Sequence, residues 1–220
     1  TLLTKPGNCC IVCGKDIEED PLGEITIKAL SNLCALINAA HDEKTSPGKI
    51  SILFSRPHNN SQGVNDMGVV PEFFPGYRDI NNASNREKVE KLWGIKLSDN
   101  IFRKDAVNII DLALNGKLKA LYVMGENPII NYPVGKDIQA ALKRVDFIVV
   151  QDTFLTETAQ LADVVFPAAT FAEKEGTFTN MGMTVQPLNK AIQPVGDAKP
   201  DWQIICELAK KMGHAYSYLS

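Results

Sequence analysis

Two stretches decide the fold. Residues 121–128 read Leu-Tyr-Val-Met-Gly-Glu-Asn-Pro, and residues 146–167 read Asp-Phe-Ile-Val-Val-Gln-Asp-Thr-Phe-Leu-Thr-Glu-Thr-Ala-Gln-Leu-Ala-Asp-Val-Val-Phe-Pro. Each begins with an apolar run of strand length that stops at a small or polar residue, which is typical of a parallel strand buried on both faces. Between them, apolar residues recur at helical spacing at Ile138, Ala141, Leu142 and Val145. Strand, helix and strand in this order predict a βαβ unit with a right-handed crossover.

A polar ligand is expected where these two strands end, because open parallel sheets bind ligands in the crevice at the carboxyl ends of their strands. Gly125, Glu126 and Asn127 follow the first strand, and Gln151 and Asp152 close the second.

Other segments extend the pattern. Strands are predicted at 9–13, 49–54 and 163–166, and helices over 24–38, 85–93, 103–115, 156–161 and 201–213. In the helix over 24–38, one apolar face carries Ile25, Ala29, Leu33 and Leu36. Asp201 is the expected N-cap of the closing helix. Residues 173–180 are polar and contain a glycine, so a loop is expected there.

The order of elements predicts an α/β fold: a three-layer, doubly wound (Rossmann-like), mostly parallel sheet with helices on both faces. We expect one domain over residues 1–220, with an irregular excursion at about 64–100.

Composition excludes several classes of protein. The chain has 220 residues, 45% hydrophobic and 22% charged, which is ordinary for a soluble globular protein. A net charge of −3 gives no support for a nucleic-acid partner, and no apolar run reaches the roughly 18 residues of a membrane span. Five cysteines without framework spacing indicate a reducing compartment, so we expect a cytoplasmic protein. Cys10 and Cys13 are predicted to be buried strand cysteines, because a metal site needs a second pair.

The segment from Ser55 to Gly63 is the second informative stretch. It places Arg56, His58 and three amides directly after a strand. The arginine offers a planar fork for a carboxylate or phosphate, and amides suit a ligand edge of mixed polarity. A solvated loop explains the same composition equally well.

The chain resembles the molybdopterin oxidoreductases, which bind molybdenum or tungsten through two molybdopterin guanine dinucleotides. The resemblance rests on motifs in a shared order at residues 124–128, 151–159, 162–167 and 173–178. Within that family, residues 59–63, 66–68, 75–77 and 201–205 are most similar to the catalytic subunit of formate dehydrogenase.

This resemblance implies a central cofactor-binding domain of a longer subunit that oxidises formate. The family's four-cysteine iron–sulfur site and the residue that ligates the metal have no match here, so no metal ligand is assigned and the chain alone should be inactive. The expected partners are formate, the remaining domains of the catalytic subunit and iron–sulfur electron-transfer subunits.

Residue roles carry over motif by motif. The resemblance assigns Arg56 to the formate anion and places His58 where the most similar relatives have glutamine. It implies cofactor contacts from Asn59, Gln62, Gly63, Gly125, Glu126, Asn127, Gln151, Asp152 and Thr156.

Two alternatives stay open. One is a cofactor-free homologue in an electron-transfer complex, such as the large subunit of complex I, because residues 181–186 lack a charged pair that many relatives carry. The other is an unrelated nucleotide-binding dehydrogenase. The sequence argues against it, because no Gly-x-Gly-x-x-Gly motif opens a helix.

Overall fold

The computed structural model describes residues 7–40, 48–56, 58–98, 109–132, 135–214 and 218. These residues form two compact units. The first consists of Thr1–Ile95 and Thr177–Gln186, and the second of Lys96–Gly176 and Pro187–Ser220. The expectation of a single domain over 1–220 stays a prediction.

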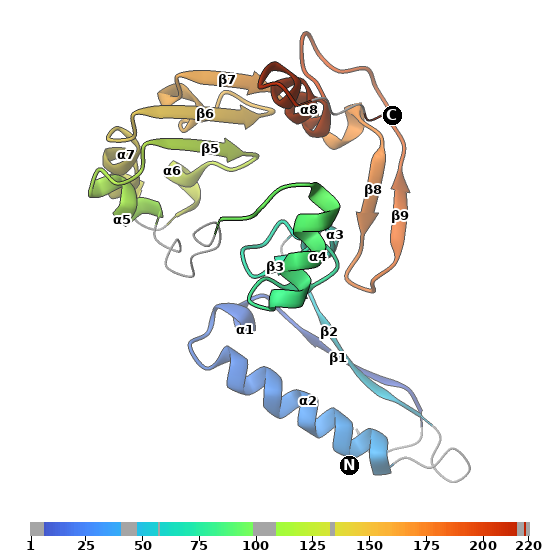
Figure 1. Cartoon of the computed structure of the whole chain (residues 1–220). Coiled ribbons are helices and arrows are strands. Elements are labelled where there is room, and N and C mark those ends of the chain that lie inside the picture. Colours follow the sequence, from blue (N-terminus) through green and yellow to red (C-terminus); the bar gives the residue numbers. More distant parts are fainter. Residues whose placement is uncertain are drawn as a thin grey trace. The chain divides into compact units, whose positions relative to one another are not determined.

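A parallel three-stranded sheet forms the centre of the second unit (Figure 1). Its strands lie in the order β5-β6-β7 and are β5 (Ala120–Met124), β6 (Phe147–Asp152) and β7 (Val164–Pro167). The helical segments of this unit are α5 (Ile109–Leu114), α6 (Pro128–Asn131), α7 (Gly135–Leu142), η2 (Ala159–Leu161), η3 (Phe171–Glu173) and α8 (Asp201–Lys211). The predicted βαβ unit is thus confirmed as β5, α7 and β6.

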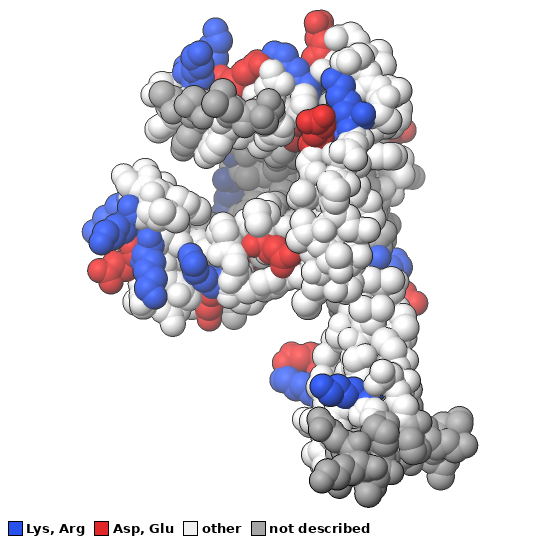
Figure 2. Space-filling model, turned by 90° about the vertical axis from the view of Figure 1, so that its right-hand side faces the viewer, with Lys and Arg blue, Asp and Glu red and all other residues white. Residues whose placement is uncertain are grey.

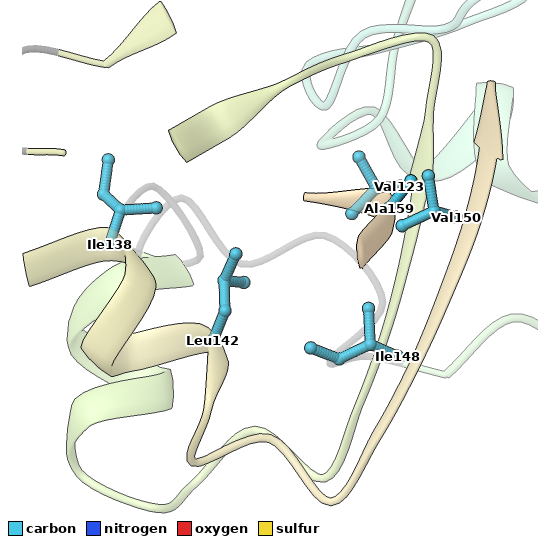
Figure 3. Close-up of a cluster of buried hydrophobic side chains, with 6 residues drawn as sticks. All are labelled: Val123, Ile138, Leu142, Ile148, Val150 and Ala159. Carbon is cyan, nitrogen blue, oxygen red and sulfur yellow. The ribbon is translucent and has the colours of Figure 1, made fainter. Parts of the chain in front are cut away.

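One face of this sheet carries the largest core. Ile138 and Leu142 of α7 are completely or almost completely buried against Ile148 and Val150 of β6 (Figure 3). Val123 of β5 and Ala159 of η2 complete the cluster. The helical spacing of these apolar residues correctly predicts which face of α7 is buried. The three-stranded sheet is wide enough to cover all of that face.

The opposite face of the same sheet is covered less. Side chains alternate along a strand, so Gln151 points away from the face that holds Val150. Asp201, the first residue of α8, contacts Gln151 on that opposite face. Tyr122 and Phe147 on this face remain partly exposed. A mixed α/β architecture with parallel sheets is therefore present, while the three-layer, doubly wound arrangement stays a prediction.

The first unit contains a two-stranded parallel sheet and a long helix. Strands β1 (Cys9–Cys13) and β2 (Ile50–Phe54) pair, and α1 (Asp16–Glu19) and α2 (Gly23–Ala40) lie between them in sequence. The further elements of this unit before residue 96 are α3 (Ser61–Asp66), β3 (Phe73–Phe74), β4 (Arg78–Asp79) and α4 (Ala83–Trp93).

Helix α2 buries a different face from the one that its sequence suggested. Cys34 and Ile37 pack on the sheet, whereas Ile25 is 66% exposed and Leu36 is 70% exposed. Asn38 explains this rotation, because its side chain donates to the Ile50 carbonyl at 2.9 Å and accepts from the Ile50 amide at 2.8 Å. The prediction that the helix face containing Ile25 is buried was therefore wrong. Two strands cover one stripe of the helix, and the two hydrogen bonds of the Asn38 amide to Ile50 select which stripe.

Three smaller corrections concern local structure. The predicted loop over 173–180 contains strand β8 (Gly176–Thr179), which pairs with β9 (Val185–Leu188) in an antiparallel hairpin. Asp201 is the first helical residue rather than the N-cap, which is Pro200. Cys10 is exposed, whereas Cys13 is buried.

The predicted helices over 85–93 and 103–115 have different outcomes. The first is confirmed as α4, which begins earlier because the Asn82 side chain accepts from the Asn85 amide at 3.2 Å. The second is confirmed over Ile109–Leu114, and its part over 103–108 lies outside the described residues.

Surface properties agree with the composition. Acidic and basic side chains are interspersed on the face drawn in Figure 2, and most of that face is uncharged. Within the described residues, no helix has the length and apolar character needed to cross a membrane.

Candidate functional site

The two strand-end segments of the second unit meet, and we call residues 125–127 and 151–158 the strand-tip cluster. The Gly125 amide donates to the Gln151 carbonyl at 2.9 Å, which joins the end of β5 to the end of β6. Gly125 has φ of 60°, in the left-handed region that glycine adopts without strain. A Cβ built at Gly125 meets no atom within 4 Å, so the backbone here is open to a close approach.

Asn127 fixes the two tips to each other. Its Oδ1 accepts from the Thr158 hydroxyl at 2.7 Å, and its Nδ2 donates to Glu157 at 2.7 Å. The bond from Asn127 lowers the pKa of Glu157, because a donated hydrogen bond favours the ionised carboxylate. The Asn127 amide is therefore occupied on both sides by protein.

Two carboxylates of the cluster retain an oxygen for a ligand. Glu126 accepts from Asn131 and from the Asn127 amide through Oε1 alone. Asp152 accepts from the Phe154 amide and the Thr153 hydroxyl through Oδ1 alone. Among the described residues, neither Glu126 Oε2 nor Asp152 Oδ2 has a hydrogen-bond partner. The cluster thus presents acceptors beside an open glycine backbone.

Gln151 is placed differently from the other predicted contacts. Its side chain is 0% exposed; Oε1 accepts from the Tyr122 hydroxyl at 2.6 Å, and Nε2 donates to Asp201 at 2.8 Å. Lys174 binds the other oxygen of Asp201. Burial first, and then the charge of Asp201, raise the pKa of Tyr122, so its hydroxyl stays protonated as a donor. Gln151 therefore holds the sheet to α8 with its side chain.

Thr156 acts on the loop itself, because its hydroxyl oxygen accepts from the Ala159 amide at 3.2 Å. This bond orders the first turn of η2, directly beside the buried Thr158.

A second site lies wholly in the first unit, as a cavity of about 710 Å³. Four of the predicted residues line it: Arg56, His58, Asn59 and Gln62. Its volume falls within the range typical of small-molecule pockets. Apolar walls come from Ile52, Leu53 and Phe54 of β2 and from the hairpin tip with Met181 and Met183. The segment predicted as a loop over 55–63 becomes helical at Ser61, which places Gln62 on the first turn of α3.

Gly63 does not line the cavity but allows the close approach of a neighbouring side chain. A Cβ at this position would approach Asn60 Oδ1 to 2.3 Å, and that oxygen accepts from the Thr179 amide at 2.9 Å. The glycine therefore allows Asn60 to hold β8 against α3.

Several other residues that line this cavity were not predicted from the sequence, among them Asp66, Tyr77, Met181 and Met183. Asp66 and Tyr77 belong to motifs on which the family resemblance rests, and those motifs were the signal that could have identified them. Tyr77 has φ of 56° and Met183 φ of 60°, and they are the two non-glycine residues with positive φ in the described chain. Strained backbone of this kind is concentrated at functional sites.

The described residues contain no group of three or more His, Cys, Asp or Glu side chains placed to hold a metal ion.

Comparison with known proteins gives one family. The model of the molybdopterin oxidoreductase family matches residues 8–211. A putative formate dehydrogenase of Staphylococcus haemolyticus is 41% identical over 202 residues, covering 92% of this chain and 20% of the relative. The alpha subunit of an F420-dependent formate dehydrogenase from Methanocaldococcus jannaschii is 44% identical over 192 residues, covering 87% of this chain and 27% of the relative. The chain thus spans between a fifth and about a quarter of these relatives.

A solved structure is also similar. Acetylene hydratase from Pelobacter acetylenicus shares 27% identity over 58% of this chain and 19% of that chain, with a TM-score of 0.46, which is too low to bear on the fold.

Proposed function

Because this chain belongs to the molybdopterin oxidoreductase family, we propose that it is the central cofactor-binding domain of a formate-dehydrogenase-like molybdenum or tungsten enzyme. The whole protein would oxidise formate to carbon dioxide with transfer of two electrons. The chain alone would be inactive, because the metal-ligating residue and the iron–sulfur cluster would lie in other parts of the enzyme. The enzyme would be cytoplasmic and would pass electrons to iron–sulfur subunits.

The strand-tip cluster would hold the guanine nucleotide of one molybdopterin guanine dinucleotide. Guanine presents N1–H and an exocyclic amine along one edge, and both are donors that a carboxylate accepts. Glu126 and Asp152 each offer an oxygen without a protein partner among the described residues, next to the open backbone of Gly125. This observation carries the proposal, because the donor-rich edge of guanine fits these acceptors.

The cavity of the first unit would face the pterin and the substrate. When bound, the cofactor supplies the metal that accepts the electrons of formate. Arg56 lines the cavity and offers a guanidinium that can hold the formate carboxylate through paired hydrogen bonds. His58 lines the same wall, and its ring can donate a hydrogen bond to a ligand or accept one from it. In the whole enzyme, the parallel sheet of the second unit would be completed as a doubly wound layer with helices on both faces.

Calorimetric titration of the 220-residue chain with GMP and with AMP tests the nucleotide proposal. GMP should bind more tightly than AMP, because adenine lacks the N1–H and presents the opposite polarity. The matched variants Glu126→Gln and Asp152→Asn each replace an acceptor by an amide of the same shape. The carboxylate that binds the base should lose GMP affinity alone, and one that binds the ribose should lose affinity for both nucleotides.

Two results would overturn the proposal: equal binding of GMP and AMP, or GMP affinity that neither variant alters. A chain that bound no nucleotide at millimolar concentration would favour the cofactor-free scaffold instead.

A further inference from the structure

Gln62 occupies an unusual position on the wall of the 710 Å³ cavity. Its Nε2 donates to Asp66 Oδ1 at 2.8 Å and to the Tyr77 hydroxyl oxygen at 2.9 Å. Both hydrogens of the amide are thereby used by protein. Gln62, Asp66 and Tyr77 all line the cavity, and we call them the polar wall.

The carboxylate of Asp66 fixes which way the Gln62 amide points. An ionised carboxylate only accepts hydrogen bonds, so the NH₂ group of Gln62 must face it. The carbonyl oxygen of Gln62 is left as an acceptor with no partner among the described residues. Tyr77 accepts from Gln62 and so keeps its own hydrogen for donation. The polar wall therefore offers an acceptor and a donor side by side.

The backbone of Tyr77 is strained in this position. Its φ of 56° lies in a region that a bulky residue adopts rarely. The Gly76 amide donates to the backbone carbonyl of Asp66 at 2.8 Å, which ties the turn before Tyr77 to the end of α3. The ring of Phe73 meets the ring of Tyr77 edge to face, with centroids 5.7 Å apart. These two contacts and the hydrogen bond from Gln62 hold a strained residue whose side chain lines the cavity.

We propose that the polar wall is a specificity element that selects a planar heterocycle through a lactam edge, in which an N–H stands beside a C=O. The N–H would donate to the Gln62 carbonyl, and the C=O would accept from the Tyr77 hydroxyl. The pyrimidinone ring of a pterin has this edge. The inference therefore rests on the proposed function, and it assigns Gln62 and Tyr77 to the recognition of that ring. Tyr77 would touch the ligand directly, and Asp66 would position Gln62.

A pair of small heterocycles tests this polarity. Pterin carries the lactam edge, whereas 2,4-diaminopteridine has the same ring system with an acceptor nitrogen beside an amine donor, which reverses the edge. Fluorescence titration of the 220-residue chain should give at least about tenfold tighter binding of pterin, because two hydrogen bonds reverse. Tyr77→Phe should weaken pterin binding by about five- to tenfold and leave 2,4-diaminopteridine binding unchanged.

Two further variants complete the experiment. Asp66→Asn should reduce the preference for pterin, because an amide at position 66 lets Gln62 turn over. Tyr132→Phe is the control, since Tyr132 is exposed in the second unit and has no hydroxyl hydrogen bond among the described residues. Circular dichroism would verify that each variant is folded.

Equal binding of the two heterocycles, binding of neither, or pterin binding that Tyr77→Phe leaves unaltered would overturn the inference. The GMP titration of the same preparation reports separately on the strand-tip cluster. Intact GMP binding with any of these three results would refute the polar wall alone, whereas loss of the GMP preference would refute the proposed function.

Discussion

Replacing Asn127 by alanine should destabilise the second unit by about 2 kcal/mol. Thr158 is 0% exposed, and both its hydroxyl and its amide hydrogen bond Asn127 Oδ1, at 2.7 and 3.4 Å. The substitution leaves these donors buried without an acceptor, and an unsatisfied buried polar group costs about 1–3 kcal/mol. The remaining bond, to Glu157, is exposed to solvent, so Glu157→Ala should lower the stability much less than Asn127→Ala and serves as the control.

Urea unfolding followed by the fluorescence of Trp202 measures the effect. Trp202 belongs to α8 in the second unit, and a Trp93→Phe background removes the tryptophan of the first unit. With a slope of about 1.5–2 kcal/mol per molar urea, the midpoint of Asn127→Ala should fall by about 1 M. Thr158→Val removes the hydroxyl, so the double variant should lose less than the sum of the two single losses.

A midpoint for Asn127→Ala within about 0.2 M of the parent, or strict additivity with Thr158→Val, would refute the reasoning. Either result would mean that the tips are held together by contacts other than the Asn127 amide.

Further predictions concern the same unit. Leu142→Ala should cost about 3 kcal/mol in the same urea assay, because the side chain is 1% exposed within the largest core; a loss under 1 kcal/mol would contradict this packing. Gly125→Ala should cost about 1–2 kcal/mol from backbone strain alone, since φ is 60° and the added Cβ meets no atom within 4 Å; an unchanged midpoint would contradict this. The lowered folded-state pKa of Glu157 stabilises the native state above the ordinary glutamate pKa of about 4.3, and this contribution disappears as the pH falls through the folded value. The difference in urea midpoint between the parent and Glu157→Gln should therefore shrink from pH 7 to pH 3, and a constant difference would exclude this origin.

The elements that the sequence predicted well are those with a strong periodic signal and a complete partner. Ile138 and Leu142 recur at helical spacing and pack against Ile148 on one face of the three-stranded sheet, so pattern and packing agree. The end of each strand is marked by a local change from apolar to polar residues. For that reason the meeting of Gly125 with Gln151 could be expected from the sequence.

What could not be predicted depends on single polar contacts between distant residues. The rotation of α2 is set by Asn38 binding the backbone of Ile50, and no periodicity reports that contact. Asp201 has the sequence of a helix cap but binds Gln151 instead, a contact across 50 residues. Tyr77 stands in a turn without helical or strand period, and its strained φ is visible only in the structure.

The central claim is that the strand-tip cluster receives a guanine nucleotide, and protein-observed NMR of the isotopically labelled chain tests it most directly. Titration with GMP should shift the amide signals of residues 125–127 and 151–156, with AMP producing smaller changes at the same positions. Signals in this cluster that stay fixed at millimolar GMP, or shifts confined to other residues, would contradict the account.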